Sequence, residues 1–207
     1  MPRSLTSRNL LEKHAGRTVQ LSGVLAEAVG NAECRGCWII YGAEKNGKTW
    51  FALTLAKEIA RFERVGFVSA EEGLDKSFQD ACLRAGITAA DKILWDEYLS
   101  INEIIEKYRR PRTPNVVFID NLTMYADELK PSELKKKLMD ALPGKLIVFV
   151  GHEERKEAYP ALARMAKKMA KVIIHIQGLK AFVISRFSAG GELSIDEQKS
   201  ALFWGEK

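Results

Sequence analysis

The sequence predicts an α/β domain in which helices flank a mainly parallel central sheet, with antiparallel strands at the C-terminal edge. Short apolar runs alternate with helix-spaced segments along most of the 207 residues, which is the pattern of repeated strand–helix units. A glycine-rich loop follows the first run, and the last runs are separated only by short turns. With 46% hydrophobic and 29% charged residues, a chain of this length is expected to form one domain.

The first strand and helix frame the most informative stretch of the chain. Residues 38–41 are apolar and predict a buried strand, and residues 47–61 predict a helix. The apolar stripe of this helix is expected to comprise Phe51, Leu55, Ile59 and Phe62. Between strand and helix, Gly42 to Thr49 matches the pattern G-x-x-x-x-G-K-[ST] in full. In this context the pattern is typical of a phosphate-binding loop, and the alternative is a glycine-lysine-threonine that only caps the helix.

Phosphate binding explains why these residue types occur together. Glycines let backbone N–H groups curl around a phosphate, and the start of the following helix adds the positive end of its dipole. We expect Lys48 to reach the β- and γ-phosphates of a nucleotide and the Thr49 hydroxyl to bind Mg²⁺. The expected nucleotide-binding residues are Gly42, Ala43, Glu44, Lys45, Asn46, Gly47, Lys48, Thr49 and Trp50.

The remaining core continues the alternation of strands and helices. Further strands are predicted at residues 65–69, 93–95, 115–119 and 146–150. Helices are predicted through Phe78, Cys82 and Leu83 up to Gly86, and over residues 101–108, 131–142 and 161–171. Three closing strands are predicted at 172–176, 181–187 and 192–195, with a tight turn at Gly190-Gly191 and one further strand at 201–204.

Residues 1–35 precede this core, and residues 36–207 form the predicted catalytic domain. The N-terminal part reads as a basic arm followed by an amphipathic segment with helical spacing. No apolar run approaches the length of a membrane span, and the first residues lack the apolar stretch of a signal peptide. We therefore expect a soluble, cytoplasmic protein that does not enter a membrane.

Acidic residues end two of the predicted strands. Asp120 closes the apolar run Val116 to Asp120, where a carboxylate orients Mg²⁺ in phosphate-loop enzymes. Glu71 and Glu72 follow the strand at residues 65–69, where a glutamate can activate a water molecule for hydrolysis. The alternatives are a helix cap at Asp120 and acids that favour a helix start at Glu71 and Glu72.

These motifs carry a family resemblance. The phosphate loop, the glutamates in FVSAEEGLD and the strand VVFID, in this order and spacing, resemble the RecA-like ATPases, with the KaiC-type proteins and the RadA/Sms repair protein as the nearest branches. The stretches VFVGH, VIIHI and SRFSAGGE resemble later parts of RadA, so the resemblance covers residues 36–204. The zinc finger and the protease-like domain of RadA are absent from this sequence.

The resemblance implies an ATPase that uses Mg²⁺-ATP, couples its nucleotide state to DNA and assembles into a ring or filament. It implies that Glu71 is the hydrolytic glutamate and that His152 is a polar sensor, although a lone histidine is as often a structural hydrogen-bonding group. Two loops, at about residues 123–132 and 153–160, would face DNA. Arg186 would act on a neighbour's nucleotide, but Ile184 and Ser185 replace the lysine and asparagine of the family's K-N-R-F-G segment. Without such a contact from a neighbour, an isolated subunit would hydrolyse ATP slowly.

Charge is distributed unevenly along the chain. Residues 130–186 contain 13 Lys/Arg against 5 Asp/Glu, a net charge of +8, while the whole chain carries +5. Helix 161–171 is expected to place its cations on one face and its apolar side chains on the other. The candidate nucleic-acid contacts are Arg155, Lys156, Arg164, Lys167, Lys168 and Lys171. Such a face suits a phosphate backbone, and a solvated basic face is the alternative.

The cysteines and the lysine-rich segment bear on other possible functions. Three cysteines argue against a disulfide framework. Cys34 and Cys37 form a C-x-x-C that could be half of a zinc site or a redox pair, but the further ligands of a zinc site are missing and Cys37 begins the first core strand. A nucleotide-dependent loader or switch with little turnover is an alternative to an ATPase. A small-molecule kinase is a further alternative, but the segment 130–137 is rich in lysine and the arginine-rich lid of such kinases is missing.

Overall fold

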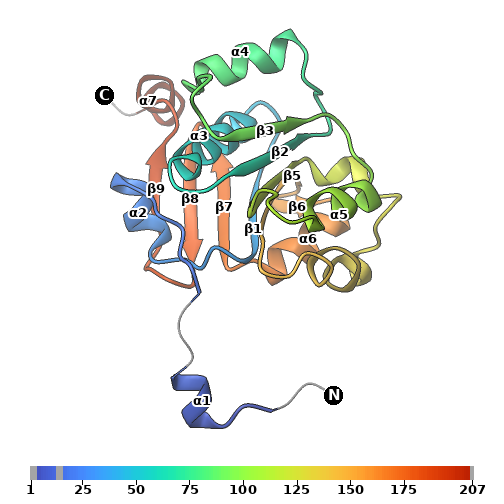
Figure 1. Ribbon diagram of the computed structural model, residues 1–207. Helices are drawn as coiled ribbons and strands as arrows, with labels where there is room; N and C mark the ends of the chain where they lie inside the picture. The colour runs from blue at the N-terminus through green and yellow to red at the C-terminus, as the bar shows by residue number, and fades with distance from the viewer. Residues whose placement is uncertain (1–3, 13–15, 206–207) are drawn as a thin grey trace.

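The computed structural model describes residues 4–12 and 16–205. A nine-stranded sheet forms the middle layer, in the order β3-β2-β4-β5-β1-β7-β8-β9, with β6 paired to β5 (Figure 1). The strands are β1 Gly36–Gly42, β2 Val65–Ser69, β3 Ile93–Asp96, β4 Val116–Asp120, β5 Leu146–Glu154, β6 Glu157–Tyr159, β7 Val172–Gln177, β8 Lys180–Ser185 and β9 Gly191–Ser194. The run from β3 to β7 is parallel, and β6, β8 and β9 pair antiparallel. The predicted fold class is confirmed.

Helices cover both faces of the sheet. They are α1 Ser7–Leu11, α2 Gly23–Val29, α3 Lys48–Ala60, α4 Lys76–Arg84, α5 Ile101–Arg109, α6 Ala161–Met169 and α7 Glu197–Trp204. Three short non-α helices add to them: η1 Leu122–Tyr125, η2 Pro131–Glu133 and η3 Leu134–Met139. One hydrophobic cluster packs α2, α3 and α4 on one face, and a second packs α5, η1, η3 and α6 on the other. Strands β2 and β4 are buried throughout, as parallel strands covered on both faces are.

Strand register brings the candidate site residues to one edge of the sheet. Gly42 at the end of β1 lies opposite His152 in β5 and Ile176 in β7. Ser69 at the end of β2 lies opposite Asp120 in β4. Because β5 separates β1 from β4, the phosphate loop and Asp120 do not follow adjacent strands. The carboxyl ends of all five strands still meet at one edge, where open α/β sheets bind ligands.

Three predicted segments fold differently. Residues 131–142 form η2 and the π-helix η3 instead of one α-helix, and Leu134 and Leu138 of η3 are buried in the core. Residues 201–204 belong to α7 and not to a strand, because the Asp196 carboxylate accepts the Lys199 N–H and starts a helix there. Residues 153–160 are a hairpin of β5 and β6 and not a loop. Phe62 was predicted to belong to the apolar stripe of the helix at residues 47–61. It lies beyond the end of α3 and is 52% exposed.

The N-terminal 35 residues contain two differently placed segments. Helix α2, which confirms the predicted amphipathic segment, packs Ala28 and Val29 into the core, and the Ser185 hydroxyl donates to the Val29 carbonyl at 2.6 Å. Helix α1 buries no side chain and stands apart from the sheet in Figure 1. Residues 1–3 and 13–15 of the expected arm lie outside the described residues. Among the helices that the structure describes, none has the length and apolar character needed to cross a membrane.

Candidate functional site

The predicted phosphate loop connects β1 to α3. Gly47 caps α3 with a φ of +96°, in a region that L side chains rarely adopt. A Cβ atom on Gly42 would lie 2.2 Å from the carbonyl oxygen of Ile176 in the neighbouring strand. The two glycines of the motif therefore allow a sharp turn at the helix start and a close approach to β7, which leaves the backbone of the loop free to surround an anion.

Lys48 points back into the loop that precedes it. Its Nζ donates to the Ala43 carbonyl at 2.9 Å, and the side chain is buried. Burial lowers the Lys48 pKa, and the charges of Asp120 and Glu71 oppose that shift. Asn46 steadies the same loop, since its Oδ1 accepts the Gly178 N–H of the β7–β8 turn at 2.7 Å. The cation is thus held where the loop would place a phosphate.

Asp120 and Thr49 provide oxygen atoms of the kind that Mg²⁺ prefers. Asp120 is 5% exposed and accepts a hydrogen bond from the Thr49 side chain. Burial raises the pKa of Asp120 to about 7, and the repulsion of Glu72 and Glu71 adds to it. A divalent cation at this point would relieve that repulsion, so the donor set fits Mg²⁺. No cluster of three or more His, Cys, Asp or Glu side chains in the described ranges could hold a metal alone, and Mg²⁺ in such sites shares its coordination with substrate phosphates.

Asn121 joins Glu71 to His152. Its side-chain amide donates to the Glu71 carboxylate and lies 3.0 Å from His152 Nε2, and the Glu71 carboxylate lies 3.4 Å from the same nitrogen. The Asn121 Oδ1 accepts the Thr123 N–H at 2.7 Å, which fixes the direction of the amide. Asn121 thereby brings together Glu71 and His152, which the sequence predicted as site residues. Asn121 itself was not predicted, and the only local signal for it is a polar side chain directly after Asp120.

Glu72 does not share these contacts. Burial, together with the charges of Glu71 and Asp75, raises its pKa. It lines the same cavity as Glu71. Of the two predicted glutamates, Glu71 is the one that Asn121 and His152 contact.

A cavity of about 700 Å³ is lined by most of the predicted site residues, but Gly42, Ala43, Asn46 and Asn121 are not among its lining. Its lining includes Glu44, Lys45, Gly47, Lys48, Thr49, Trp50, Glu71, Glu72, Asp120 and His152. It also includes residues that the sequence reasoning missed, namely Ser77, Ala81 and Arg84 from α4, Leu179 from the β7–β8 turn and Lys199 from α7. The volume lies in the range of about 300–1,000 Å³ that is usual for small-molecule sites.

A second missed pair lies beside the phosphate loop. The Glu153 carboxylate at the end of β5 lies 2.6 Å from His175 Nε2 in β7. The His175 ring stacks on Tyr41, with 4.7 Å between centroids, and Lys167 Nζ of α6 lies 4.5 Å from the centre of the Tyr41 ring. Because Tyr41 directly precedes Gly42, these contacts connect the phosphate loop to helix α6.

The candidate nucleic-acid residues lie in two places. Five cations line a groove of about 490 Å³ beside α6, which we call the basic groove: Arg164, Lys167, Lys168, Lys171 and Arg186. Within it, Lys167 pairs with Glu157 at 3.2 Å and Lys171 pairs with Glu33, so part of its charge is neutralised. Arg155 and Lys156 instead form the turn between β5 and β6, with φ values of +52° and +66°.

Arg186 lies far from the phosphate loop of its own chain. It follows Ser185, which pairs with Val172 at the beginning of β7, and Val172 lies opposite Trp38 in β1. Gly42 is further along β1, so at a rise of about 3.3 Å per residue the two sites are separated by more than about 10 Å along the strands. The structure does not bring Arg186 to the nucleotide cavity of its own chain.

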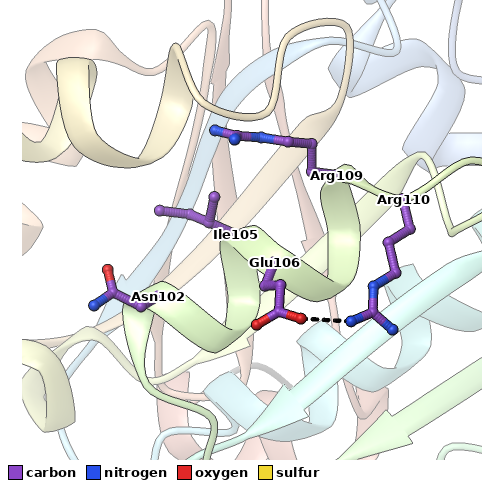
Figure 2. Close-up of a pocket in the computed structure, with 5 residues that line it drawn as sticks. All are labelled: Asn102, Ile105, Glu106, Arg109 and Arg110. Carbon is purple, nitrogen blue, oxygen red and sulfur yellow. Dashed lines mark hydrogen bonds and ion pairs between the residues drawn. The ribbon is translucent and has the colours of Figure 1, made fainter.

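A further hollow of about 440 Å³ runs along α5 (Figure 2). Asn102, Ile105, Glu106, Arg109 and Arg110 line it, and Glu106 pairs with Arg110 one helical turn away at 2.5 Å. Such a pair is ordinary on an exposed helix face. This hollow shares no lining residue with the nucleotide cavity.

Comparison with known proteins identifies the fold. No family model matches the sequence, and no curated protein matches it either. Among solved structures, the chain is similar to one described as an ATPase domain, with a TM-score of 0.64 and 15% sequence identity over 93% of each chain. At this identity the likeness shows the fold alone. The chain therefore shares the α/β fold of that domain, with the mainly parallel sheet and the antiparallel edge strands that the sequence predicts.

Proposed function

We propose that this chain binds ATP and hydrolyses it with the help of Mg²⁺. The observation that carries the proposal is the position of Glu71, which Asn121 and His152 hold at a cavity that Lys48, Thr49 and Asp120 also line. A phosphate loop alone would support binding. A carboxylate held beside it adds a group that can accept a proton from water. The similar structure, which is described as an ATPase domain, agrees with this proposal.

Each residue of the site has a separate role in the proposed hydrolysis of ATP. Lys48 and the loop N–H groups hold the β- and γ-phosphates. Thr49 and Asp120 would hold Mg²⁺, which neutralises charge on the phosphate oxygens when it is bound. The oxygen of a water molecule forms a bond to the γ-phosphorus while the bond from that phosphorus to the β–γ bridging oxygen breaks, and Glu71 takes the proton of the water. Asn121 keeps Glu71 in position, and His152 contacts both and responds to the product.

We also propose that the nucleotide state is coupled to DNA binding. The cations of the basic groove suit a phosphate backbone. Arg155 and Lys156 hold positive φ angles at the exposed tip of a hairpin, and strained backbone often accompanies function. The contacts from Lys167 to Tyr41 and on to Gly42 supply a physical connection between groove and loop.

Assembly belongs to the same proposal. Since Arg186 lies away from its own cavity, it can act on a nucleotide only in another subunit. An arginine supplied in trans raises hydrolysis about 10³- to 10⁵-fold in related chemistry. A ring or filament would then be the active form, and the isolated chain would be a slow ATPase. Kinship with the RadA/Sms and KaiC-type branches stays a prediction.

A steady-state ATPase assay with no DNA, single-stranded DNA and duplex DNA tests the proposal. We expect DNA to raise the rate at about 50 mM salt and to do so less at about 200 mM, because phosphate contacts weaken with salt. Arg164→Ala with Lys168→Ala should weaken DNA binding and flatten its salt dependence. Arg109→Ala with Arg110→Ala removes the same charge from α5 and should change neither. A rate independent of DNA would refute the coupling.

The position of Arg186 also favours one alternative, a nucleotide-dependent loader or switch with little turnover. Such a protein would bind ATP with Mg²⁺ and change its affinity for DNA, and Glu71→Gln would leave its already low rate unchanged. Light scattering in the presence of Mg²⁺-ATP and DNA tests the assembled form. A chain that remains monomeric under these conditions would contradict the ring or filament.

A further inference from the structure

The nucleotide cavity extends beyond the phosphate loop. Besides the loop and the acidic residues, its lining includes Trp50 and residues of α4, of the β7–β8 turn and of the C-terminal helix α7, which we together call the second end of the cavity. This second end has a different chemistry, since it combines an indole ring with two cations. Its lining residues are Trp50, Ser77, Ala81, Arg84, Leu179 and Lys199.

Trp50 lies at the centre of this second end. It directly follows Thr49, so its ring leaves α3 next to the residue expected to bind Mg²⁺. The Arg84 guanidinium carbon lies 5.8 Å from the centre of the indole, and Lys199 Nζ lies 5.4 Å from it. Both distances fall within the limit of about 6 Å for a cation–π contact. Two chain segments remote in sequence thus place their cations on one ring beside the phosphate site.

Helix α7 is attached to the phosphate loop by a short series of hydrogen bonds. Trp204 Nε1 donates to the Gly178 carbonyl at 3.2 Å, and the Gly178 N–H donates to Asn46 of the loop. At the other end of the helix, Asp196 accepts the Lys199 N–H and lies 3.1 Å from Lys199 Nζ. These contacts hold Lys199 at the cavity.

We propose that Trp50, Arg84 and Lys199 form the subsite for the base and ribose of the nucleotide, an inference that rests on the proposed function. A base stacked on an aromatic ring contributes about 1–3 kcal/mol to binding. Arg and Lys are hydrogen-bond donors only, whereas the Ser77 hydroxyl can donate or accept and so suits either purine. None of the six residues named at this end has a carboxylate or amide side chain. Donors suit the N7 of either purine and the O6 of guanine, whereas the amino group of adenine needs an acceptor. The subsite therefore accepts purine nucleoside triphosphates without selecting against guanine.

The test compares ATP and GTP with inorganic tripolyphosphate, which has the phosphates and no nucleoside. We expect Arg84→Ala and Lys199→Ala each to weaken ATP and GTP binding by several-fold, because each removes a cation from beside the ring on which the base would stack. Tripolyphosphate binding, measured by calorimetry near physiological salt, should change less than about twofold, because salt screens exposed charges that do not touch it. Wild-type affinities for ATP and GTP should agree within about tenfold.

Control variants separate a local effect from lost charge or lost folding. Lys76→Ala removes one positive charge from the same helix as Arg84 without lining the cavity, and Gln198→Ala changes α7 beside Lys199. Both should leave all three affinities unchanged, with an unaltered Tm for every variant. The subsite would be overturned if Arg84→Ala and Lys199→Ala weakened the binding of ATP and of tripolyphosphate equally, or weakened neither. It would also be overturned if the wild type strongly preferred ATP over GTP. A wild-type chain that binds none of the three ligands would refute the proposed function itself and this inference with it.

Discussion

The side-chain amide of Asn121 donates a hydrogen bond to the Glu71 carboxylate across 50 positions of sequence. The bond can form because β2 and β4 are neighbours, with Ser69 opposite Asp120. Asn121 directly follows Asp120, and Glu71 lies two residues after Ser69, where its N–H donates to the Asp120 carbonyl at 3.3 Å. His152 reaches the same point from β5. Three consecutive strands of the sheet thus each supply one residue to the edge where the phosphate loop lies.

Glu71→Gln is expected to abolish most ATP hydrolysis and to keep ATP binding. The amide preserves the shape of the side chain and an oxygen that accepts from Asn121, but it cannot take a proton. A lost general base corresponds to about a 10²- to 10⁴-fold lower rate. Single-turnover hydrolysis and a binding titration measure the two quantities separately. Glu72→Gln is the matched control and should reduce the rate far less; the opposite order would reassign the base to Glu72.

Asn121→Ala is expected to slow hydrolysis and to destabilise the fold. Asn121 is 1% exposed, and its Oδ1 accepts the Thr123 N–H. A buried donor left without a partner costs about 1–3 kcal/mol, which urea unfolding can measure. Asn102→Ala on the exposed face of α5 should change the free energy of unfolding by less than about 0.5 kcal/mol. If Asn121→Ala kept full stability and full activity, the hydrogen bonds of Asn121 would have no role in either.

The parts of the site that could be predicted are those encoded in a few consecutive residues. Lys48, Thr49 and Asp120 stand in local patterns whose spacing carries the chemistry. The contact of Asn121 with Glu71 and the pair of Glu153 and His175 depend on strand order, which no local pattern specifies. Both pairs join residues that lie in or shortly after different strands.

Two segments whose secondary structure was predicted wrongly differ from the prediction for physical reasons. The apolar run Ala201 to Trp204 resembles a strand, but the Asp196 cap begins a helix before it. That cap was a readable signal, since an aspartate followed by a glutamate is typical of a helix start. In residues 134–139, two leucines flank three lysines, and this spacing suits an α-helix as well as the wider π-helix that forms. The π-helix could therefore not be predicted without knowledge of the core into which Leu134 and Leu138 pack.

Gly42→Ala is expected to disturb both the fold and nucleotide binding. Its new Cβ would lie 2.2 Å from a backbone oxygen of Ile176, which cannot move aside without shifting β7. Forcing additional atoms into such a place costs about 1–3 kcal/mol or more. Gly16→Ala is the control, since a Cβ there meets nothing within 4 Å. Thermal unfolding and ATP titration should separate the two variants clearly, and equal behaviour would contradict the close packing of the loop on β7.

The three cysteines are expected to resist thiol reagents in the folded protein. Burial raises the pKa of Cys37 to about 12 and that of Cys82 to about 11. The pKa of Cys34 is also raised to about 11, mainly by burial and further by the charge of Glu63. Because the thiolate is the reactive form, a chromogenic disulfide reagent at pH 8 should react slowly with the native protein and rapidly with three thiols after denaturation. Fast native labelling of Cys34 and Cys37 would revive a redox role for the pair.

Glu33 is expected to make stability depend on pH in an acidic window. The hydrogen bonds from Arg35 and Lys171 hold the pKa of Glu33 at about 2, below its ordinary value of 4.5. The folded state therefore binds fewer protons than the unfolded state between these values, and stability rises with pH there. The contribution is present in full above about pH 4.5 and is lost as the pH falls towards 2.

Urea unfolding of the wild type and of Glu33→Gln across this window measures the contribution directly. We expect the wild type to be the more stable at pH 5 and the difference to shrink steadily as the solution is acidified, because protonated Glu33 loses its attraction to both cations. Glu12→Gln removes a carboxylate from an exposed pair with Arg8 and should show little difference at any pH, since exposed pairs contribute little. A wild-type advantage that stayed constant from pH 5 to pH 3 would show that Glu33 acts through packing and hydrogen-bond geometry, with its charge playing no part.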